Sequence, residues 1–382
     1  MFERELFSTG HEIFRETVRR FIADEITPFH TQWEKDGQVS REVWRKAGEQ
    51  GLLCATVPEE YGGSGADFLY SVVVLEELSR AGAMGPGFSL HSDIVAPYLV
   101  QYGSDEQKRT WLPKMITGEV IGAIAMTEPS AGSDLQNIQT TAIRDGDEYR
   151  ISGQKVFITN GQLSNIVITA CKTDPQTGGK GVSLVLVETD RAGFQRGRNL
   201  EKVGWKAQDT SELFFDEVRV PASNLLGQEG RGFVQLMEQL PQERLLQAIR
   251  AATTIEAALE WTVDYTTTRR AFDRPIAAFQ NTRFKLADVK SQALMLRVFV
   301  DRCIAMHLEG RLDAVDAAVV KLLSSEMLGK LLDECLQLFG GYGYMWEYPI
   351  ARAWADARMS RIAGGTCEIM REIIGRSIVG RG

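Results

Sequence analysis

The sequence changes its hydrophobic period twice along its 382 residues, and this limits the folds that it can adopt. Residues 1–119 and 230–382 place apolar side chains at helical spacing, whereas residues 120–229 contain short apolar runs separated by turn signals. No helical stripe separates those runs, so an antiparallel sandwich or barrel is expected rather than a parallel sheet. The sequence therefore predicts an α+β protein with an N-terminal α-helical domain, a middle antiparallel β domain and a C-terminal four-helix bundle.

The expected elements can be placed by residue number. The C-terminal region carries long helical stripes with short connections, at 232–268, 280–308, 314–339 and 359–379. The middle region carries apolar runs that are expected to be strands, at 120–126, 155–159, 166–170 and 182–187. In the N-terminal region, Ser104 and Gln107 form a capping-box pattern that predicts the start of a helix.

Composition and charge exclude several classes of function. The net charge is −8 and no long basic run occurs, so nucleic acid is not an expected partner. The longest apolar runs are far too short for a membrane span. The five cysteines form no C-x-x-C pair and the four histidines lack metal-ligand spacing, so we expect free thiols and no metal site. The N-terminus has neither signal-peptide nor transit-peptide character, which indicates a cytoplasmic prokaryotic protein, or a processed chain of the mitochondrial matrix.

One stretch of the first long stripe breaks two local rules at once. Leu236, Leu240 and Glu243 stand at i, i+4 and i+7, which places a carboxylate on an apolar helix face. Pro241 removes a backbone donor inside the same helix, so a kink and an unpaired carbonyl are expected. A carboxylate that faces an apolar cavity loses solvation, and its pKa rises toward the range that suits a general base.

The same stretch also has a purely structural interpretation. Glutamate–arginine neighbours such as Glu243 and Arg244 are usually solvated on helices, and a proline often does no more than bend a helix. Taken alone, the stretch favours this structural interpretation, so other parts of the chain have to decide between the two.

Five further motifs occur in order along the chain. They are 126–134 (MTEPSAGSD), 153–160 (GQKVFITN), 269–272 (RRAF) with Gln280 downstream, 337–343 (QLFGGYG) and 364–368 (GGTCE). Each motif is weak by itself. Together, and in this order of helices, strands and helices, they resemble the acyl-CoA dehydrogenase family over essentially the whole chain.

The resemblance implies FAD as the cofactor, bound without a Rossmann fold, and the sequence has no strand–G-x-G-x-x-G–helix unit. Residues of the first two motifs would form a wall against the isoalloxazine ring and donate hydrogen bonds to its polar edge. These residues are Ile124, Ala125, Met126, Thr127, Gly132, Ser133, Phe157, Ile158 and Thr159. Turn chemistry alone would also explain Thr127 and Ser133.

The resemblance further implies cofactor contacts that span two subunits, and therefore a homo-oligomer, usually a tetramer. Arg269 is similar to the residue that reaches the FAD diphosphate of a neighbouring subunit, since a guanidinium matches phosphate oxygens in shape and charge. The other residues implied in cofactor binding are Phe272, Gln280, Gln337, Leu338, Phe339, Gly340, Gly341, Thr366, Cys367 and Glu368. A helix C-cap would also explain Gly340 and Gly341.

The position of the catalytic base departs from most of the family, which carries a glutamate where this chain has Gly364. The long-chain and isovaleryl branches are similar to this chain: they have a small residue there and a glutamate at the position of Glu243. The resemblance then implies that Glu243 removes the α-proton of a fatty acyl-CoA while the β-hydrogen leaves as hydride to flavin N5. The products would be a trans-2-enoyl-CoA and electrons for an electron-transferring flavoprotein, as in fatty acid β-oxidation.

Other residues would hold the substrate. The backbone N–H of Gly364 would donate to the thioester oxygen as negative charge develops on it. Lys180 would meet the CoA phosphates, Val234 would line the acyl channel, and Arg244 would meet CoA or a structural carboxylate. The remaining expected contacts are Ser133, Pro241, Gln242 and Gly365.

Two alternative functions stay open at this point. One is an oxygen-using relative of the same fold, an acyl-CoA oxidase or a flavin monooxygenase, although a monooxygenase has no obvious use for Glu243. The other is a non-catalytic scaffold that binds acyl-CoA or flavin. The residues do not decide the length or branching of the acyl chain.

Overall fold

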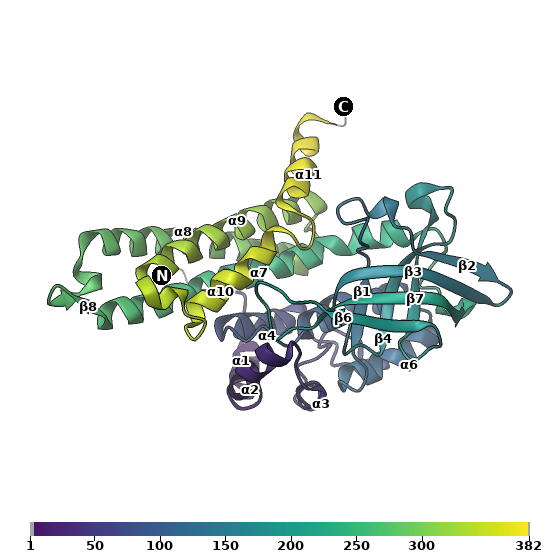
Figure 1. Cartoon of the computed structure of the whole chain (residues 1–382), viewed down its shortest axis with the longest axis horizontal. Coiled ribbons are helices and arrows are strands. Elements are labelled where there is room, and N and C mark those ends of the chain that lie inside the picture. Colours follow the sequence, from purple (N-terminus) through teal and green to yellow (C-terminus); the bar gives the residue numbers. More distant parts are fainter. Residues whose placement is uncertain (1–3, 381–382) are drawn as a thin grey trace.

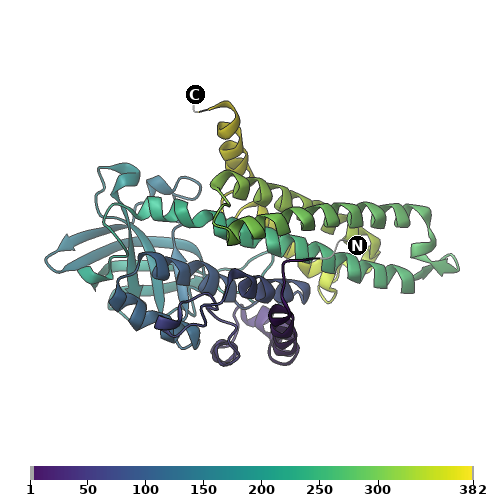
Figure 2. The same cartoon turned by 180° about the vertical axis from the view of Figure 1, so that it is seen from behind.

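The computed structural model describes residues 4–380 and contains three regions that follow one another along the chain (Figure 1). Long helices lie side by side along the longest axis, and the strands gather at one end of them. The N-terminal helices pack along the long helices, as the view from behind also shows (Figure 2). The order helices, strands, helices confirms the fold class that the two changes of hydrophobic period predict.

Within residues 4–119 the structure contains six α-helices. They are α1 (Thr9–Phe21), α2 (Thr27–Asp36), α3 (Arg41–Glu49), α4 (Phe68–Arg80), α5 (Ala96–Tyr102) and α6 (Asp105–Ile116). The predicted capping box of α6 is confirmed, because Gln107 N–H donates to Ser104 Oγ at 3.1 Å and Ser104 N–H donates to Gln107 Oε1 at 2.9 Å. Two π-helical turns, η1 (Ile22–Ile26) and η3 (Leu90–Val95), precede α2 and α5.

In the described chain the middle region forms a seven-stranded sheet. Its strands are β1 (Gly122–Ala125), β2 (Thr141–Asp145), β3 (Glu148–Thr159), β4 (Ile166–Lys172), β5 (Val182–Glu188), β6 (Phe194–Asn199) and β7 (Thr210–Pro221). The sheet is mostly antiparallel, as expected, but β1 pairs parallel with β4 and β2 meets β4 in parallel at one register. The chain passes through β2 and β3 before β4, and this long excursion lets β4 return beside β1 in the same direction.

The C-terminal region is built on long helices whose bounds largely match the prediction. They are α7 (Gly232–Thr268), α8 (Gln280–Leu308) and α9 (Ala314–Leu338), followed by the shorter α10 (Pro349–Ala357) and α11 (Cys367–Val379). The prediction of a helix from residue 359 is wrong at its start, and α10 is not predicted. Gly364 and Gly365 have φ of 67° and 93°, a backbone conformation that an α-helix does not contain, so α11 begins only after them.

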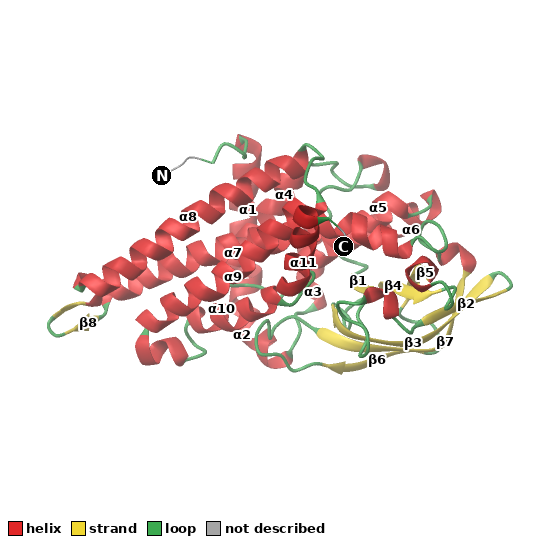
Figure 3. Cartoon of the chain, turned by 90° about the horizontal axis from the view of Figure 1, so that it is seen from above, coloured by secondary structure: helices red, strands yellow, loops and turns green. Residues whose placement is uncertain are grey.

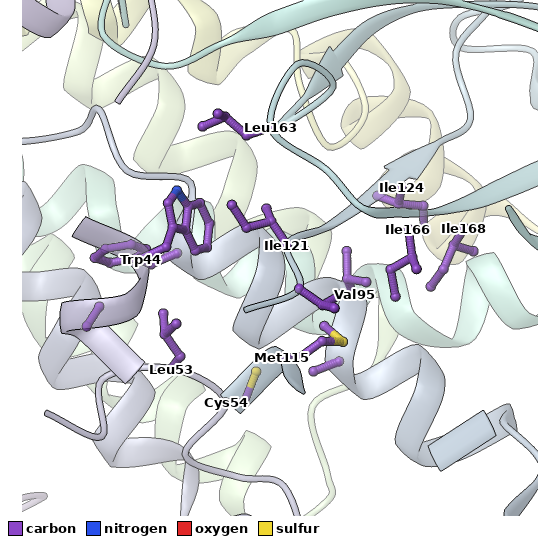
Figure 4. Close-up of a cluster of buried hydrophobic side chains, with 14 of the residues drawn as sticks. Trp44, Leu53, Cys54, Val95, Met115, Ile121, Ile124, Leu163, Ile166 and Ile168 are labelled. Carbon is purple, nitrogen blue, oxygen red and sulfur yellow. The ribbon is translucent and has the colours of Figure 1, made fainter. Parts of the chain in front are cut away.

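Hydrophobic clusters hold the three regions together. One cluster joins the N-terminal helices to the sheet, where Trp44 lies near Ile121, and Val95 lies near Ile166 (Figure 4). Another joins α4 to α7, α8 and α9. Viewed from above, α5 and α6 lie beside the strands while α7, α8 and α9 run together (Figure 3). Between these two groups of elements, the turn η3 contacts both β1 and α7.

A group of buried charges also joins the N-terminal helices to the long helices. Glu76 on α4 is 3% exposed and lies within 2.8 Å of Arg4, 3.0 Å of Arg15 and 2.9 Å of Arg297. Burial by itself would raise the pKa of Glu76, but the charges of Arg297, Arg4 and Arg15 lower that pKa to about 2. This carboxylate therefore stays ionised throughout the neutral range.

All five cysteines are free and buried. Between residues 4 and 380, no helix combines the length and the apolar character that crossing a bilayer requires. Over the same range, no cluster of His, Cys, Asp and Glu side chains could hold a metal ion.

Candidate active site

Glu243 lies on the buried face of α7, as the position of this residue on an apolar stripe predicts. The residue is 8% exposed, and Leu236 and Leu245 beside it are also buried. The hydroxyl of Tyr98 on α5 donates to Glu243 Oε1 at 3.2 Å. Burial raises the pKa of Glu243 to about 7, although the Tyr98 hydrogen bond and the charge of Arg244 act in the opposite direction. The carboxyl group can therefore gain or lose a proton near neutral pH.

The helix turn that carries Glu243 is tied to the sheet through η3. Gln242 Nε2 donates to the carbonyl of Asp93 on η3 at 2.6 Å. On its other side, η3 packs against β1, where Gly122 N–H donates to His91 Nδ1 at 3.0 Å. Pro241 lies inside α7, and the helix continues past it to Thr268. Glu243 thus sits on a rigid element between the sheet and the long helices.

The loop that contains Gly364 and Gly365 approaches the same part of α7. Arg244 Nε donates to the carbonyl of Gly364 at 3.4 Å, and Lys321 Nζ donates to the carbonyl of Gly365 at 2.5 Å. A side chain built at Gly364 would begin 3.8 Å from Cγ of Gln247, one helical turn beyond Glu243. The two alternative positions for a carboxylate, 243 and 364, therefore border one space.

The guanidinium of Arg244 binds a backbone carbonyl of the glycine loop. It is 5% exposed, and its partner in the structure is the carbonyl of Gly364, whereas the expectation is CoA or a structural carboxylate. Burial lowers the pKa of Arg244, and the charge of Glu243 partly restores it. The guanidinium therefore supports the glycine loop from the α7 side.

The first two cofactor motifs meet at the ends of β1 and β3. Val156 N–H donates to the carbonyl of Thr127 at 3.0 Å, and the buried Lys155 Nζ donates to Glu128 Oε1 at 2.8 Å and to the carbonyl of Met126 at 3.1 Å. Phe157 has φ of 61° and is 66% exposed, so its ring stands open on the surface. The structure therefore brings together most of the expected wall.

The individual wall residues differ in exposure. Ile124, Ala125 and Ile158 are buried in strands, and Thr127 and Thr159 are half-buried. Gly132 and Ser133 are exposed on the loop that follows β1. The half-buried hydroxyl groups and the exposed ring of Phe157 are the parts of this wall that a ligand could reach.

The third and fourth motifs lie together at the opposite end of the long helices from the sheet, near the β8 (Arg270–Ala271) hairpin (Figure 1). The guanidinium of Arg269 lies 5.6 Å from the ring centre of Tyr342, which directly follows Gly341. Phe272 is 88% exposed, and a Cβ added at Gly340 or Gly341 would meet no atom within 4 Å. A single chain therefore does not unite these residues with the wall on the sheet.

The remaining residues of the third and fourth motifs are mostly exposed or half-buried. Gln280 and Gln337 are exposed, Leu338 is half-buried, and Phe339 is buried under Tyr265, whose ring stacks on it at 4.3 Å. Their exposure fits a surface that is completed by a molecule outside this chain.

The remaining expected residues lie near two helix starts. Lys180 is exposed on η5 (Gly178–Gly181), and its backbone carbonyl lies beside Gly230. Val234 is half-buried in the first turn of α7. Thr366 caps α11, since Ile369 N–H donates to its Oγ1 at 3.3 Å. Cys367 is buried and Glu368 is exposed.

Two residues of this site are missed by sequence reasoning. Tyr98 donates to Glu243 from α5, and nothing in the sequence connects two residues so far apart. Lys321 could have been found from the sequence, because it lies within the apolar run of α9. A lysine buried there, as Lys321 is, needs an oxygen atom that accepts hydrogen bonds from its amino group. That oxygen is the carbonyl of Gly365.

Comparison with known proteins agrees with this architecture. The models of the acyl-CoA dehydrogenase N-terminal, middle and C-terminal domains match residues 8–119, 123–218 and 230–379. The chain is 50% identical to the long-chain specific acyl-CoA dehydrogenase, mitochondrial, of Sus scrofa, over 98% of this chain and 88% of that protein.

Two solved structures are similar over nearly the whole chain. An acyl-CoA dehydrogenase from Geobacillus kaustophilus has a TM-score of 0.97 and 49% identity, and covers 98% of this chain and 100% of its own. An acyl-CoA dehydrogenase from Bacillus anthracis, described as complexed with FAD, has a TM-score of 0.92 and 32% identity, and covers 99% of this chain and 68% of its own.

Proposed function

Because the chain belongs to the acyl-CoA dehydrogenase family, we propose that it dehydrogenates a fatty acyl-CoA to the trans-2-enoyl-CoA. In this proposal FAD is the cofactor, Glu243 is the base that removes the α-proton, and an electron-transferring flavoprotein receives the electrons. The observation that carries the proposal is the buried carboxyl group of Glu243, with its pKa near 7, beside a glycine loop.

The residues of this chain fit FAD. The exposed ring of Phe157 and the hydroxyl groups of Thr127 and Thr159 offer a flat surface with donors at its edge. Gly340 and Gly341 leave their backbone open, and Arg269 beside them offers an exposed cation for a diphosphate. When bound, FAD supplies the oxidant that accepts a hydride from the β-carbon of the substrate.

Glu243 is suited to the proton transfer for two reasons. Its pKa of about 7 means that a large fraction is ionised at neutral pH and that it takes up a proton readily. Its position on the buried face of a continuous helix fixes the carboxylate, and Tyr98 holds one of its oxygens. Glu238 and Glu260 on the same helix are exposed, so their carboxyl groups are not held on the buried face.

The glycine loop is suited to hold the thioester carbonyl. In this proposal the N–H of Gly364 donates to the carbonyl oxygen as enolate charge develops on it. Arg244 and Lys321 bind the carbonyls of Gly364 and Gly365 from α7 and α9, and so hold the two peptide groups that follow Gly364. Without a side chain, Gly364 also leaves room beside Glu243 for the substrate.

We also propose domain boundaries at 1–119, 120–229 and 230–382, and a homotetramer. The separation of the wall at the ends of β1 and β3 from the group around Arg269 supports an oligomer. A neighbouring subunit can place one group against the other, which a single chain does not do. Lys180, near the start of α7, is the proposed contact for the CoA phosphates.

The proposed base is tested by Glu243→Gln, which keeps the shape of the side chain and removes its basicity. We expect the variant to bind FAD but to reduce it with acyl-CoA about 10²–10⁴-fold more slowly under anaerobic conditions. Bleaching of the flavin absorbance in a stopped-flow experiment measures this rate.

The matched control is Glu238→Gln on the same helix. Glu238 is exposed and accepts a hydrogen bond from Tyr102 at 2.7 Å, so it resembles Glu243 in its tyrosine partner but not in its burial. The control should bleach at close to the wild-type rate. A near-normal rate for Glu243→Gln would rule out this base assignment.

A further inference from the structure

A small cavity lies along α7, one to three turns beyond Glu243. Its polar lining comes from Gln247, Arg250 and Thr254 on α7 and from Asp356 on α10, and Trp205 from the loop before β7 covers it. Its volume of about 30 Å³ leaves room for one water molecule or one oxygen-bearing group. Apolar side chains such as Met84, Trp261 and Leu328 complete the lining, so the cavity is mostly apolar with a few polar groups in its wall.

Arg250 is one of two arginines in the wall of this cavity, and it lacks a full set of partners. One guanidinium nitrogen donates to Gln247 Oε1 at 3.2 Å, and the group lies 4.5 Å from the ring centre of Trp205. Its Nε is buried and has no hydrogen-bond partner among the described residues. A buried donor without an acceptor is costly, so Nε of Arg250 can pair with an acceptor that a ligand brings.

One carboxyl group lies in the wall of the cavity, and a second lies near Arg250 outside the lining. Asp356 accepts a hydrogen bond from Trp205 N–H at 2.5 Å, and burial raises the pKa of Asp356 to about 7. Asp93 on η3 is near enough to favour the charged form of Arg250, and burial raises the pKa of Asp93 to about 6. With Arg352 also in the wall, donors and acceptors both face the space beside Arg250.

Part of the cavity lining lies on the same face of α7 as Glu243. Glu243, Gln247, Arg250 and Thr254 follow one another on a single face of α7. Gln247 borders both the glycine loop at Gly364 and the cavity. Seven residues separate Glu243 from Arg250, which is about 10 Å along a helix. In the proposed mode of binding, an acyl chain that ran along this face from Glu243 would reach Arg250 after about 10 Å.

We infer that Arg250 forms a polar end to the acyl pocket and selects acyl-CoAs that carry an oxygen atom at the far end of the acyl chain. The shared chemistry is a hydrogen-bond acceptor, either a neutral hydroxyl or a carboxylate, that pairs with Nε of Arg250. The inference rests on the proposed function. It deepens that function by naming a class of substrate that a wholly apolar pocket would disfavour.

The test compares acyl-CoAs of equal chain length that end in a methyl, a hydroxyl or a carboxyl group, over a series of lengths. Flavin reduction gives kcat/KM for each. We expect the wild-type enzyme to prefer an oxygen-bearing chain of one length by on the order of tenfold over its methyl counterpart. The better of the hydroxyl and carboxyl substrates tells whether the group is neutral or anionic.

Variants locate the preference. Arg250→Met should remove or reverse it, and Arg250→Lys should retain part of it. Arg352→Met is the matched control, since Arg352 lines the same cavity but donates to the carbonyl of Trp346 at 3.1 Å, and it should keep the preference. FAD content and melting temperature verify that each variant is folded. If Arg250→Met does not fold, the comparison of methyl-, hydroxyl- and carboxyl-terminated substrates on the wild-type enzyme decides whether the inference holds.

Two results would overturn the inference. One is a wild-type preference for methyl-terminated chains at every length, and the other is an oxygen preference that persists in Arg250→Met. In both cases acyl-CoA still reduces the flavin, so the proposed function stands. If no acyl-CoA of any kind reduces the flavin, the proposed function itself fails.

Discussion

Two glutamates, Glu76 and Glu243, are both almost fully buried in helices, yet their surroundings differ in kind. Glu76 lies against three guanidinium groups, which lower its pKa to about 2. Glu243 has one tyrosine hydroxyl at 3.2 Å, and its pKa rises to about 7. Burial acts in the same direction on both, so the number of charged partners decides whether a buried carboxylate holds the fold or can move a proton.

The comparison also separates two regions of the molecule. The group around Glu76 joins α1, α4 and α8, where its partners satisfy every charge and favour a fixed arrangement. In the region around Glu243, the carboxyl group is held by one tyrosine hydroxyl, and farther along α7 the Nε of Arg250 has no hydrogen-bond partner among the described residues. Incompletely paired groups of this kind are expected where a ligand has to bind.

The largest expected contrast is in stability. Glu76→Gln removes the buried negative charge that Arg4, Arg15 and Arg297 share, and should lower the free energy of unfolding by about 3–5 kcal/mol. The control Glu260→Gln breaks an exposed pair with Arg80 and should cost about 1 kcal/mol or less. Denaturant unfolding followed by fluorescence measures both. If Glu76→Gln were no more destabilising than the control, the structural role of the buried charges would be wrong.

The next contrast is the pH dependence of stability. The folded pKa of Glu243 lies above the ordinary value of 4.5, so ionising this carboxyl group destabilises the fold as pH rises from 4.5 through about 7. Glu243→Gln avoids that cost, and should be more stable than wild type by about 3 kcal/mol at pH 8. Melting temperatures measured from pH 4 to pH 8 should show the gap closing toward low pH. A gap that is constant with pH would mean that the carboxyl group titrates normally.

Glu76 should show the opposite dependence. Its folded pKa of about 2 lies below 4.5, so its stabilising contribution is fully present above pH 4.5 and is lost as pH falls toward 2. The two glutamates thus act in different pH windows, and the same titration of melting temperature separates them.

The smallest expected effect is on the pH profile of catalysis. Tyr98 donates to Glu243, and this hydrogen bond lowers the pKa of the carboxyl group. Tyr98→Phe should raise that pKa and move the ascending limb of kcat/KM by up to about one pH unit toward higher pH. Tyr102→Phe, whose hydroxyl pairs with the exposed Glu238, should leave the limb in place. An unchanged limb in Tyr98→Phe would show that Tyr98 does not tune the base.

Local patterns predict much of the fold. The bounds of α7 and α8 match the predicted stripes, and the capping box of α6 forms as expected, because helical period and cap chemistry depend on residues a few positions apart. The burial of Glu243 is likewise visible in the stripe from Leu236. The late start of α11 is not, since it depends on the backbone conformation of Gly364 and Gly365.

What the sequence determined by itself is which side chains share a helix face, and therefore that a carboxylate on α7 would be buried. The tertiary structure decided what meets that carboxylate: Tyr98 from α5, the glycine loop supported by Lys321, and the cavity at Arg250. It also decided that β1 lies parallel to β4. The physical reason is that spacing along one helix or strand is set by local backbone geometry, whereas contacts between distant segments depend on the path of the whole chain.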